Sequence, residues 1–118
     1  MKIGLVSEFD AAHHLPGYKG KCANIHGHTY KVEAVLDGPV DDASGFVMDF
    51  FDFKKVLGQA LEDLDHRYLN EILPSPTAEH IAVYISSRLK KELLGTPARL
   101  VSVKLWEGKN KWVMVDEQ

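Results

Sequence analysis

Two histidines separated by one glycine, His26-Gly27-His28, are the residues of this chain best placed to do chemistry. In an extended strand, residues two apart point to the same face, so the two imidazoles would lie side by side. Zinc binds imidazole nitrogens readily, and a catalytic zinc site typically has three protein ligands and one position open to water or substrate. The pair therefore predicts two ligands of a metal site. The spacing alone leaves open the alternative of two surface imidazoles at a strand end.

A third histidine can come from the end of the preceding strand. Apolar residues alternate over 3–9, which predicts a half-buried strand that ends near Ala11. A hairpin partner that begins at His26 would bring His13 and His14 close to the histidine pair. Adjacent strand residues point to opposite faces, so only one of these two can face the pair, and the spacing does not choose between them.

The only cysteine, Cys22, lies between these strands, on a loop from Leu15 to Ile25 that contains one proline and two glycines. A single cysteine excludes an intrachain disulfide. A thiol close to histidines is a candidate metal ligand or nucleophile, and an inert buried thiol is the plainer interpretation.

Two further places carry groups that can exchange protons or hold a ligand. Asp65 and His66 are adjacent, and because neighbouring helix residues do not face each other, a working pair needs irregular backbone or separate partners. Glu107 stands at the tip of a predicted hairpin, where its carboxylate could grip a guanidine-like group by two parallel hydrogen bonds. Ordinary solvated side chains, or a helix cap at Asp65, remain the alternatives.

Length and composition restrict the class of protein. The chain has 118 residues, of which 45% are apolar and 26% charged, with a net charge of -3. We therefore expect one domain over residues 1–118, large enough to bury a core without disulfides or a structural metal. The charge argues against a nucleic-acid surface. Without a signal peptide or a run of about 20 apolar residues, we expect a cytoplasmic protein.

The hydrophobic pattern predicts six elements in the order strand, strand, helix, helix, strand, strand. This order indicates an α+β fold with a four-stranded antiparallel sheet and two helices on one face. Apolar residues also point to the second face, which we expect other subunits to cover; they are Val6, Val35, Leu100 and Trp106. The pattern places strands over 3–11, 26–36, 100–106 and 111–115, a short extended piece over 45–48, a helix after an Asp49 and Asp52 capping box, and a helix capped by Ser75 or Thr77.

Six short motifs follow one another along nearly the whole chain: Phe9-Asp10-Ala11-Ala12-His13; Cys22 with His26-Gly27-His28; Gly45 with Val47-Met48-Asp49-Phe50; Leu64-Asp65-His66 with Leu69-Asn70; Pro76-Thr77-Ala78-Glu79; and Glu107. This order resembles the 6-pyruvoyl-tetrahydropterin synthase family. The gap of three residues between cysteine and histidine is similar to that of its 6-carboxy-5,6,7,8-tetrahydropterin synthase branch. Two positions depart from the family pattern, because His80 replaces a common asparagine and Gly108 a usual threonine.

The resemblance implies a role for each of the residues that could do chemistry. It implies that Zn²⁺ is bound by three histidines, which selects His13 over His14. The implied roles are metal binding for His13, His26 and His28, catalysis for Cys22, Asp65 and His66, and substrate binding for Glu107, Thr77 and Glu79.

The resemblance also implies an activity and an assembly. The activity converts 7,8-dihydroneopterin triphosphate to 6-carboxytetrahydropterin, acetaldehyde and triphosphate, in the biosynthesis of queuosine and other 7-deazapurines. The assembly is the tunnelling fold, in which three subunits form a twelve-stranded barrel and two trimers stack into a homohexamer with sites between subunits. The alternatives are a pyruvoyl-forming or related pterin lyase and, from another class, a non-catalytic zinc- or pterin-binding module.

Overall fold

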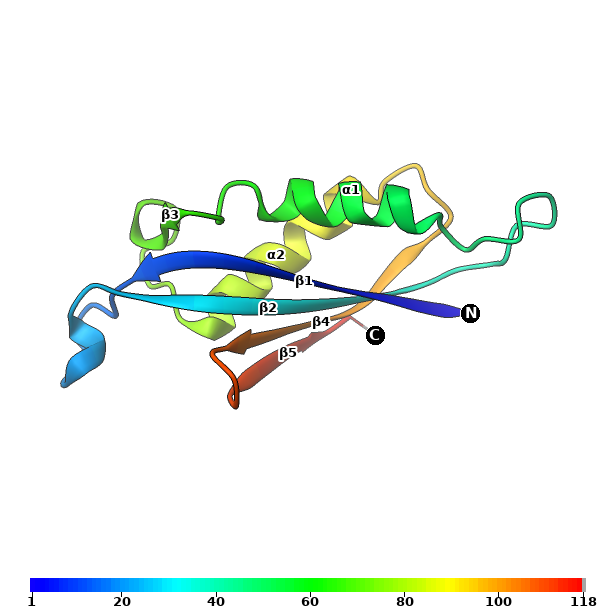
Figure 1. The fold of residues 1–118 in the computed structure, drawn as a ribbon. Coiled ribbons are helices and arrows are strands. Elements are labelled where there is room, and N and C mark those ends of the chain that lie inside the picture. The colour runs from blue at the N-terminus through cyan, green and yellow to red at the C-terminus, as the bar shows by residue number, and fades with distance from the viewer. Residues whose placement is uncertain (118) are drawn as a thin grey trace.

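The computed structural model describes residues 1–117. Its five-stranded sheet has the order β3-β1-β2-β4-β5, and every pairing is antiparallel except that of β1 with β3 (Figure 1). The predicted α+β class with two helices is confirmed.

The elements are β1 (Lys2–His13), β2 (His26–Asp37), α1 (Phe50–Leu61), β3 (Arg67–Tyr68), α2 (Ala78–Glu92), β4 (Arg99–Glu107) and β5 (Trp112–Asp116), with 3-10 turns η1 (Lys21–Ala23) and η2 (Leu69–Glu71). The sequence did not predict β3, because two residues are too few to show an alternating pattern.

The long hairpin of β1 and β2 gives the molecule its shape. Each strand has 12 residues, and their pairing runs without a break from Lys2 opposite Asp37 to His13 opposite His26. Twelve extended residues span about 40 Å, and the whole molecule measures 54 by 22 by 21 Å. β1 continues two residues beyond its predicted end, so that a histidine from each strand forms the last pair of the hairpin.

The two faces of the sheet differ in what covers them. One face packs against both helices, with α1 beside β1 and α2 against β4 and β5 (Figure 1). The strand residues buried beneath the helices include Phe9, Ala11, Tyr30, Val32, Ala34, Leu36, Leu100, Val103 and Leu105. We call the opposite side the open face; Val6, Val35, Trp106, Trp112 and Met114 point to it.

A β-bulge corrects one expectation about the open face. The sequence pattern placed Leu100 among the apolar residues of a possible second face. The pairing of β2 with β4 shifts register between Val35 and Leu36, so that Leu36 pairs with Leu100 and both side chains are buried in the core. A bulge adds one residue to a strand and reverses the side that the following residues face.

Both helices begin at a capping side chain. The Asp49 carboxylate accepts a hydrogen bond from the Phe51 backbone N–H at 2.9 Å, one residue earlier than the predicted capping box requires. Thr77, rather than Ser75, caps α2 by accepting from the His80 N–H at 3.2 Å. Each helix then buries an apolar stripe at spacings of three and four, which holds both helices against the sheet.

The predicted extended piece over 45–48 is wrong. This segment belongs to a closed turn, in which Asp41 N–H donates to the Phe46 carbonyl and Gly45 N–H to the Asp41 carbonyl. Gly45 has a φ of 78°, a backbone conformation that glycine adopts without strain. A local ring of hydrogen bonds therefore replaces strand pairing here.

Helices in residues 1–117 are each too short or too polar to cross a bilayer.

Candidate metal centre and its surroundings

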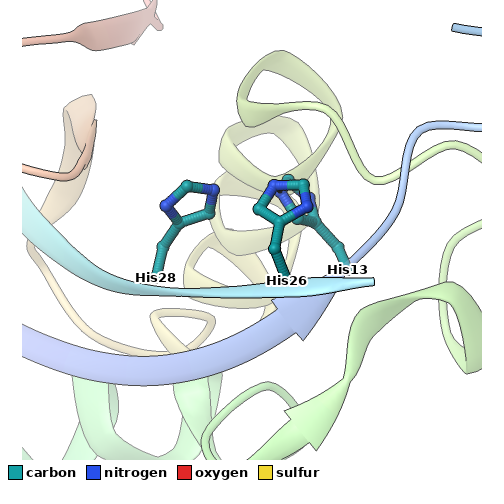
Figure 2. Close-up of side chains that lie close together, drawn as sticks. All are labelled: His13, His26 and His28. Carbon is teal, nitrogen blue, oxygen red and sulfur yellow. Dashed lines mark hydrogen bonds between the residues drawn. The ribbon is translucent and has the colours of Figure 1, made fainter. Parts of the chain in front are cut away.

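Three histidines converge at the end of the long hairpin. His13 lies at the end of β1, and His26 and His28 lie at the start of β2, all on the side of the sheet that the helices cover. One nitrogen of each ring lies within 4.8 Å of the others. Figure 2 shows the three rings rising from the same side of the two strands. The structure thus brings together the three predicted ligands, and of the two adjacent histidines it is His13 that joins the cluster.

Backbone carbonyls fix the protonation of two of these rings. His13 Nδ1 donates to the Pro76 carbonyl at 2.7 Å, and His26 Nδ1 donates to the Asn24 carbonyl at 2.7 Å. A carbonyl can only accept, so each of these nitrogens must carry the proton. In the neutral form of both rings, Nε2 is then left with a free lone pair.

Those two lone pairs face each other. The Nε2 atoms of His13 and His26 are 3.0 Å apart, and His13 is almost fully buried with 1% of its surface exposed. Two unprotonated nitrogens at this distance repel unless a cation or a shared proton lies between them. A ligand histidine typically donates its other ring N–H to a carbonyl or carboxylate, which is the arrangement found here. The residues therefore fit a divalent metal such as zinc.

His28 completes the cluster with a nitrogen that lacks a hydrogen bond. Within residues 1–117, its buried Nε2 has no hydrogen-bond partner, and the Glu107 Oε1 lies 3.3 Å away. Burial lowers the pKa of His28 below its ordinary value; the Glu107 carboxylate opposes this effect, and His13 and His26 add to it. A lowered pKa favours the neutral imidazole, which is the form that binds metals.

Cys22 lies in the loop that joins the two histidine-bearing strands. It belongs to the 3-10 turn η1, and its thiol is partly buried. The loop closes through a hydrogen bond of 2.8 Å from the Leu15 N–H to the Cys22 carbonyl. The single thiol is therefore tied to the end of the molecule that carries the histidine cluster.

Asp65 and His66 form a pair outside the histidine cluster. His66 Nδ1 lies 2.9 Å from Asp65 Oδ1, and the predicted irregular backbone is present, because His66 has a φ of 59°. The pair is anchored to β1, where Asp10 N–H donates to Asp65 Oδ1 at 3.1 Å and the Asp10 carbonyl accepts from His66 N–H at 2.6 Å. The Asp10 N–H and, to a lesser extent, His66 hold the pKa of Asp65 below its ordinary value.

His66 faces a shallow groove of about 460 Å³ on the open face. Asp10, Ala12, Gly27 and Thr29 line it, and strand alternation points these four side chains away from the histidine cluster. Ala11 and His28, from the helix side of the sheet, line it as well. His66 therefore lies outside the cluster of three rings and shares its groove mainly with side chains of the open face.

The three predicted substrate-binding residues lie near the start of α2 and the end of β4. Glu79 and Glu107 line one cavity of about 200 Å³, with Lys111 and Trp112 among its other walls. Thr77 uses its hydroxyl oxygen to cap α2. Through Glu107, this cavity lies next to His28.

Several groups that hold the cluster escaped the sequence analysis. The Pro76 and Asn24 carbonyls are backbone atoms, which every residue possesses, so no residue type signals their role. The side chain of Asn70 bonds to the backbone of His14, a contact between segments 56 residues apart. A motif containing Asn70 was visible in the sequence, but its partner was not.

Comparison with known proteins agrees with this architecture. The family model for 6-pyruvoyl tetrahydropterin synthase matches residues 2–118. The chain belongs to this family. A dihydroneopterin monophosphate aldolase of Pyrococcus furiosus is 42% identical over 102 residues, which cover 86% of this chain and 85% of that protein. A protein of Archaeoglobus fulgidus, provisionally assigned as a 6-carboxy-5,6,7,8-tetrahydropterin synthase, is 41% identical over 115 residues, or 98% of this chain and 95% of that protein.

The family's fold is also found in a solved structure. The 6-pyruvoyl tetrahydropterin synthase of Caenorhabditis elegans superposes with a TM-score of 0.87 at 29% identity, covering 100% of this chain and 96% of that one. The predicted family is confirmed, and so is the fold that its single subunits share. Members of the 6-pyruvoyl tetrahydropterin synthase family are pterin lyases, so the chain is an enzyme of that kind.

The cluster predicts one zinc per chain, bound through all three imidazoles. His28→Ala should lose the metal, because two imidazoles alone rarely retain zinc against a chelator. Elemental analysis after dialysis measures this directly. His66→Ala is the matched control, since it removes an exposed histidine outside the cluster and should keep the metal. Full zinc content in His28→Ala would rule out His28 as a ligand.

Proposed function

We propose that this chain is a zinc-dependent 6-carboxy-5,6,7,8-tetrahydropterin synthase, which converts 7,8-dihydroneopterin triphosphate to 6-carboxytetrahydropterin, acetaldehyde and triphosphate. The observation that carries the proposal is the cluster of three imidazoles with two fixed tautomers, at the end of the loop that bears the only thiol. The relative from Archaeoglobus fulgidus supports this branch of the family.

The metal would be held by His13, His26 and His28. When bound, zinc supplies Lewis-acid chemistry, polarising an oxygen of the substrate and orienting its side chain. The Pro76 and Asn24 carbonyls keep the ligand nitrogens of two of these rings deprotonated and aimed at the metal. Burial of His13 keeps bulk water away from one side of the site.

Two groups of the chain would move protons. Cys22, as a thiolate, would take a proton from the substrate side chain. The Nδ1–H of His66 is held by Asp65 Oδ1, 2.9 Å away, which leaves Nε2 free to give or take a proton at the pterin. Because the pKa of Asp65 is lowered, its carboxylate stays ionised at neutral pH and maintains this tautomer.

The cavity between the start of α2 and the end of β4 would hold the pterin. A pterin presents an amino group and a ring N–H side by side, and the carboxylate of Glu107 can accept both in parallel. Glu79 lines the same cavity of about 200 Å³ and adds a second acceptor. His28 lies beside Glu107, so a pterin held there would place its side chain next to the metal site.

A complete site would need more than one chain. His66 lines the groove of the open face, whereas the histidine cluster lies on the side of the helices. The twelve-stranded barrel of a homohexamer, built as a dimer of trimers, would let this pair serve the thiol and metal of a neighbouring subunit. The apolar side chains of Val6, Trp112 and Met114, each about half exposed, are consistent with a sheet face that other chains enclose.

A second candidate is the reaction named for the Pyrococcus furiosus relative, a dihydroneopterin monophosphate aldolase. It is favoured by an identity of 42%, similar to that of the carboxy-type relative. Both candidates need the same pterin anchor and proton-transfer groups, and they differ in the phosphates of the substrate and in the bonds broken. A third candidate reaction for the same residues is formation of the pyruvoyl product.

Product analysis tests the proposal. The zinc-loaded protein should turn over 7,8-dihydroneopterin triphosphate and release acetaldehyde with one equivalent of 6-carboxytetrahydropterin, separated by chromatography and identified by mass. The monophosphate is the matched comparison substrate. Preferential cleavage of the monophosphate would favour the aldolase, a pyruvoyl product would favour the synthase of the pyruvoyl type, and binding without turnover of either substrate would favour a non-catalytic module.

Replacement of the thiol separates a base from a fourth ligand. Cys22→Ala should retain zinc and pterin binding but lose activity by a factor on the order of a hundred or more, because only proton abstraction is removed. Zinc content, pterin affinity and rate should be measured on the same preparation. Loss of zinc together with activity would identify Cys22 as a ligand, and normal turnover would exclude it as the base.

The proposed hexamer has its own test. Light scattering at micromolar concentration should report a mass of six chains, since the proposed site takes Asp65 and His66 from a neighbouring subunit. Two inactive variants, Cys22→Ala and His66→Ala, should regain activity when their subunits are mixed and reassembled. Some sites of the mixed oligomer then combine an intact Cys22 from one subunit with an intact His66 from its neighbour. A monomer, or mixtures that stay inactive despite exchange of subunits, would contradict shared sites.

A further inference from the structure

The side chain of Asn70 pairs with the backbone of His14 as a strand would. Its Oδ1 accepts from the His14 N–H at 2.9 Å, and its Nδ2 donates to the His14 carbonyl at 3.0 Å. Both backbone polar groups of one residue are therefore satisfied by one amide from a distant segment. The short ladder of β1 with β3, which pairs Ala12 with Tyr68, is in effect extended by two residues.

Tyr68 adds a contact to the same residue. Its Oη lies 2.6 Å from His14 Nδ1, and the two rings stack with centroids 5.9 Å apart at an angle of 21°. His14, Tyr68 and Asn70 are all partly buried, so these bonds are only partly exposed to competing water. We call the contacts of Tyr68 and Asn70 with His14 the strand-end clamp.

The position of the clamp explains what it can do. The pairing of β1 with β2 ends at His13 opposite His26, and the chain beyond leaves the sheet for the loop that contains Cys22. Terminal pairs of a ladder open more readily than internal ones. Here the terminal residue is a candidate metal ligand, and its imidazole must stay within about 0.5 Å of its place for tight binding.

The clamp also touches the loop of the thiol. Leu15, the residue after His14, donates its N–H to the Cys22 carbonyl at 2.8 Å. The clamped residue thus stands between the candidate ligand on one side and the anchor of the Cys22 loop on the other.

We propose that Asn70, supported by Tyr68, is a positioning residue: its amide fixes the end of β1 so that His13 and the Cys22 loop keep the geometry of the metal site. The part that concerns Cys22 rests on the proposed function, whereas the part that concerns His13 rests on the histidine cluster alone.

Metal affinity tests this role without any substrate. Asn70→Ala should bind zinc roughly tenfold more weakly than the unaltered chain in competition with a chromogenic chelator, the lower end of the effect of outer-shell partners. The cobalt(II) form should show a changed visible absorption, since a displaced imidazole distorts the coordination. Asn110→Ala is the matched control, because it removes an exposed asparagine in the turn between β4 and β5.

Further measurements separate positioning from general stability. Zinc affinity is measured well below the melting temperature of the metal-free variant, so that a merely structural loss leaves it unchanged. Tyr68→Phe keeps the stacked ring and removes only the hydroxyl, and it should weaken zinc binding less than Asn70→Ala. Should Asn70→Ala fail to fold, hydrogen exchange on the unaltered chain decides, since a clamped His14 N–H must exchange far more slowly than the amides of the exposed residues Gly17, Lys19 and Gly20.

The outcomes are distinct. Unchanged zinc affinity and cobalt spectrum in Asn70→Ala, or an unprotected His14 amide, would overturn the positioning role even if the chain proves to be the proposed synthase. Weaker zinc binding in Asn70→Ala, in a chain that turns over no dihydroneopterin phosphate, would support the clamp while the proposed function fails.

Discussion

Two imidazole nitrogens that face each other at 3.0 Å are the constraint on which this end of the molecule depends. The Nδ1–H groups of His13 and His26 donate hydrogen bonds to backbone carbonyls, so in the neutral state both opposing nitrogens carry lone pairs. Such an arrangement is favourable only with a positive charge between the rings, and contacts from more than one segment of the fold keep the two rings in place. The register of β1 and β2 places His13 opposite His26, and the turn before α2 supplies the Pro76 carbonyl that accepts from His13.

The fold supports this arrangement mainly through the length of one hairpin. Twelve unbroken pairs between β1 and β2 carry the histidines to one end of a molecule 54 Å long, away from most of the helical core. The strict alternation of side chains then separates two kinds of chemistry. The three candidate metal ligands lie on the side of the helices, whereas His66, proposed to transfer protons, lines the groove of the open face, where a second chain would use it.

The same short segment serves both sides of the sheet. Residues 65–70 follow α1 after a turn and pair with β1. Within them, His66 has a left-handed backbone conformation, and its N–H donates to the Asp10 carbonyl. Asn70 then bonds to His14 beside the histidine cluster. A segment fastened at both ends in this way couples the geometry of the two proposed halves of the site. Its many backbone bonds explain how a strained residue such as His66 can persist on an exposed surface.

The sequence by itself determined the class of fold, the strand over His26–Asp37 and the residues able to bind metal, because alternation and a spacing of two follow from local backbone geometry. Tertiary structure decided the rest. It placed His13 rather than His14 in the cluster, a choice that the family resemblance indicated but the spacing left open because strand phase depends on the partner strand, and a bulge turned Leu100 inward. The carbonyls that set the tautomers, and the amide of Asn70 that fixes β1, act across tens of residues. Such contacts have no local signature, and only the folded chain reveals them.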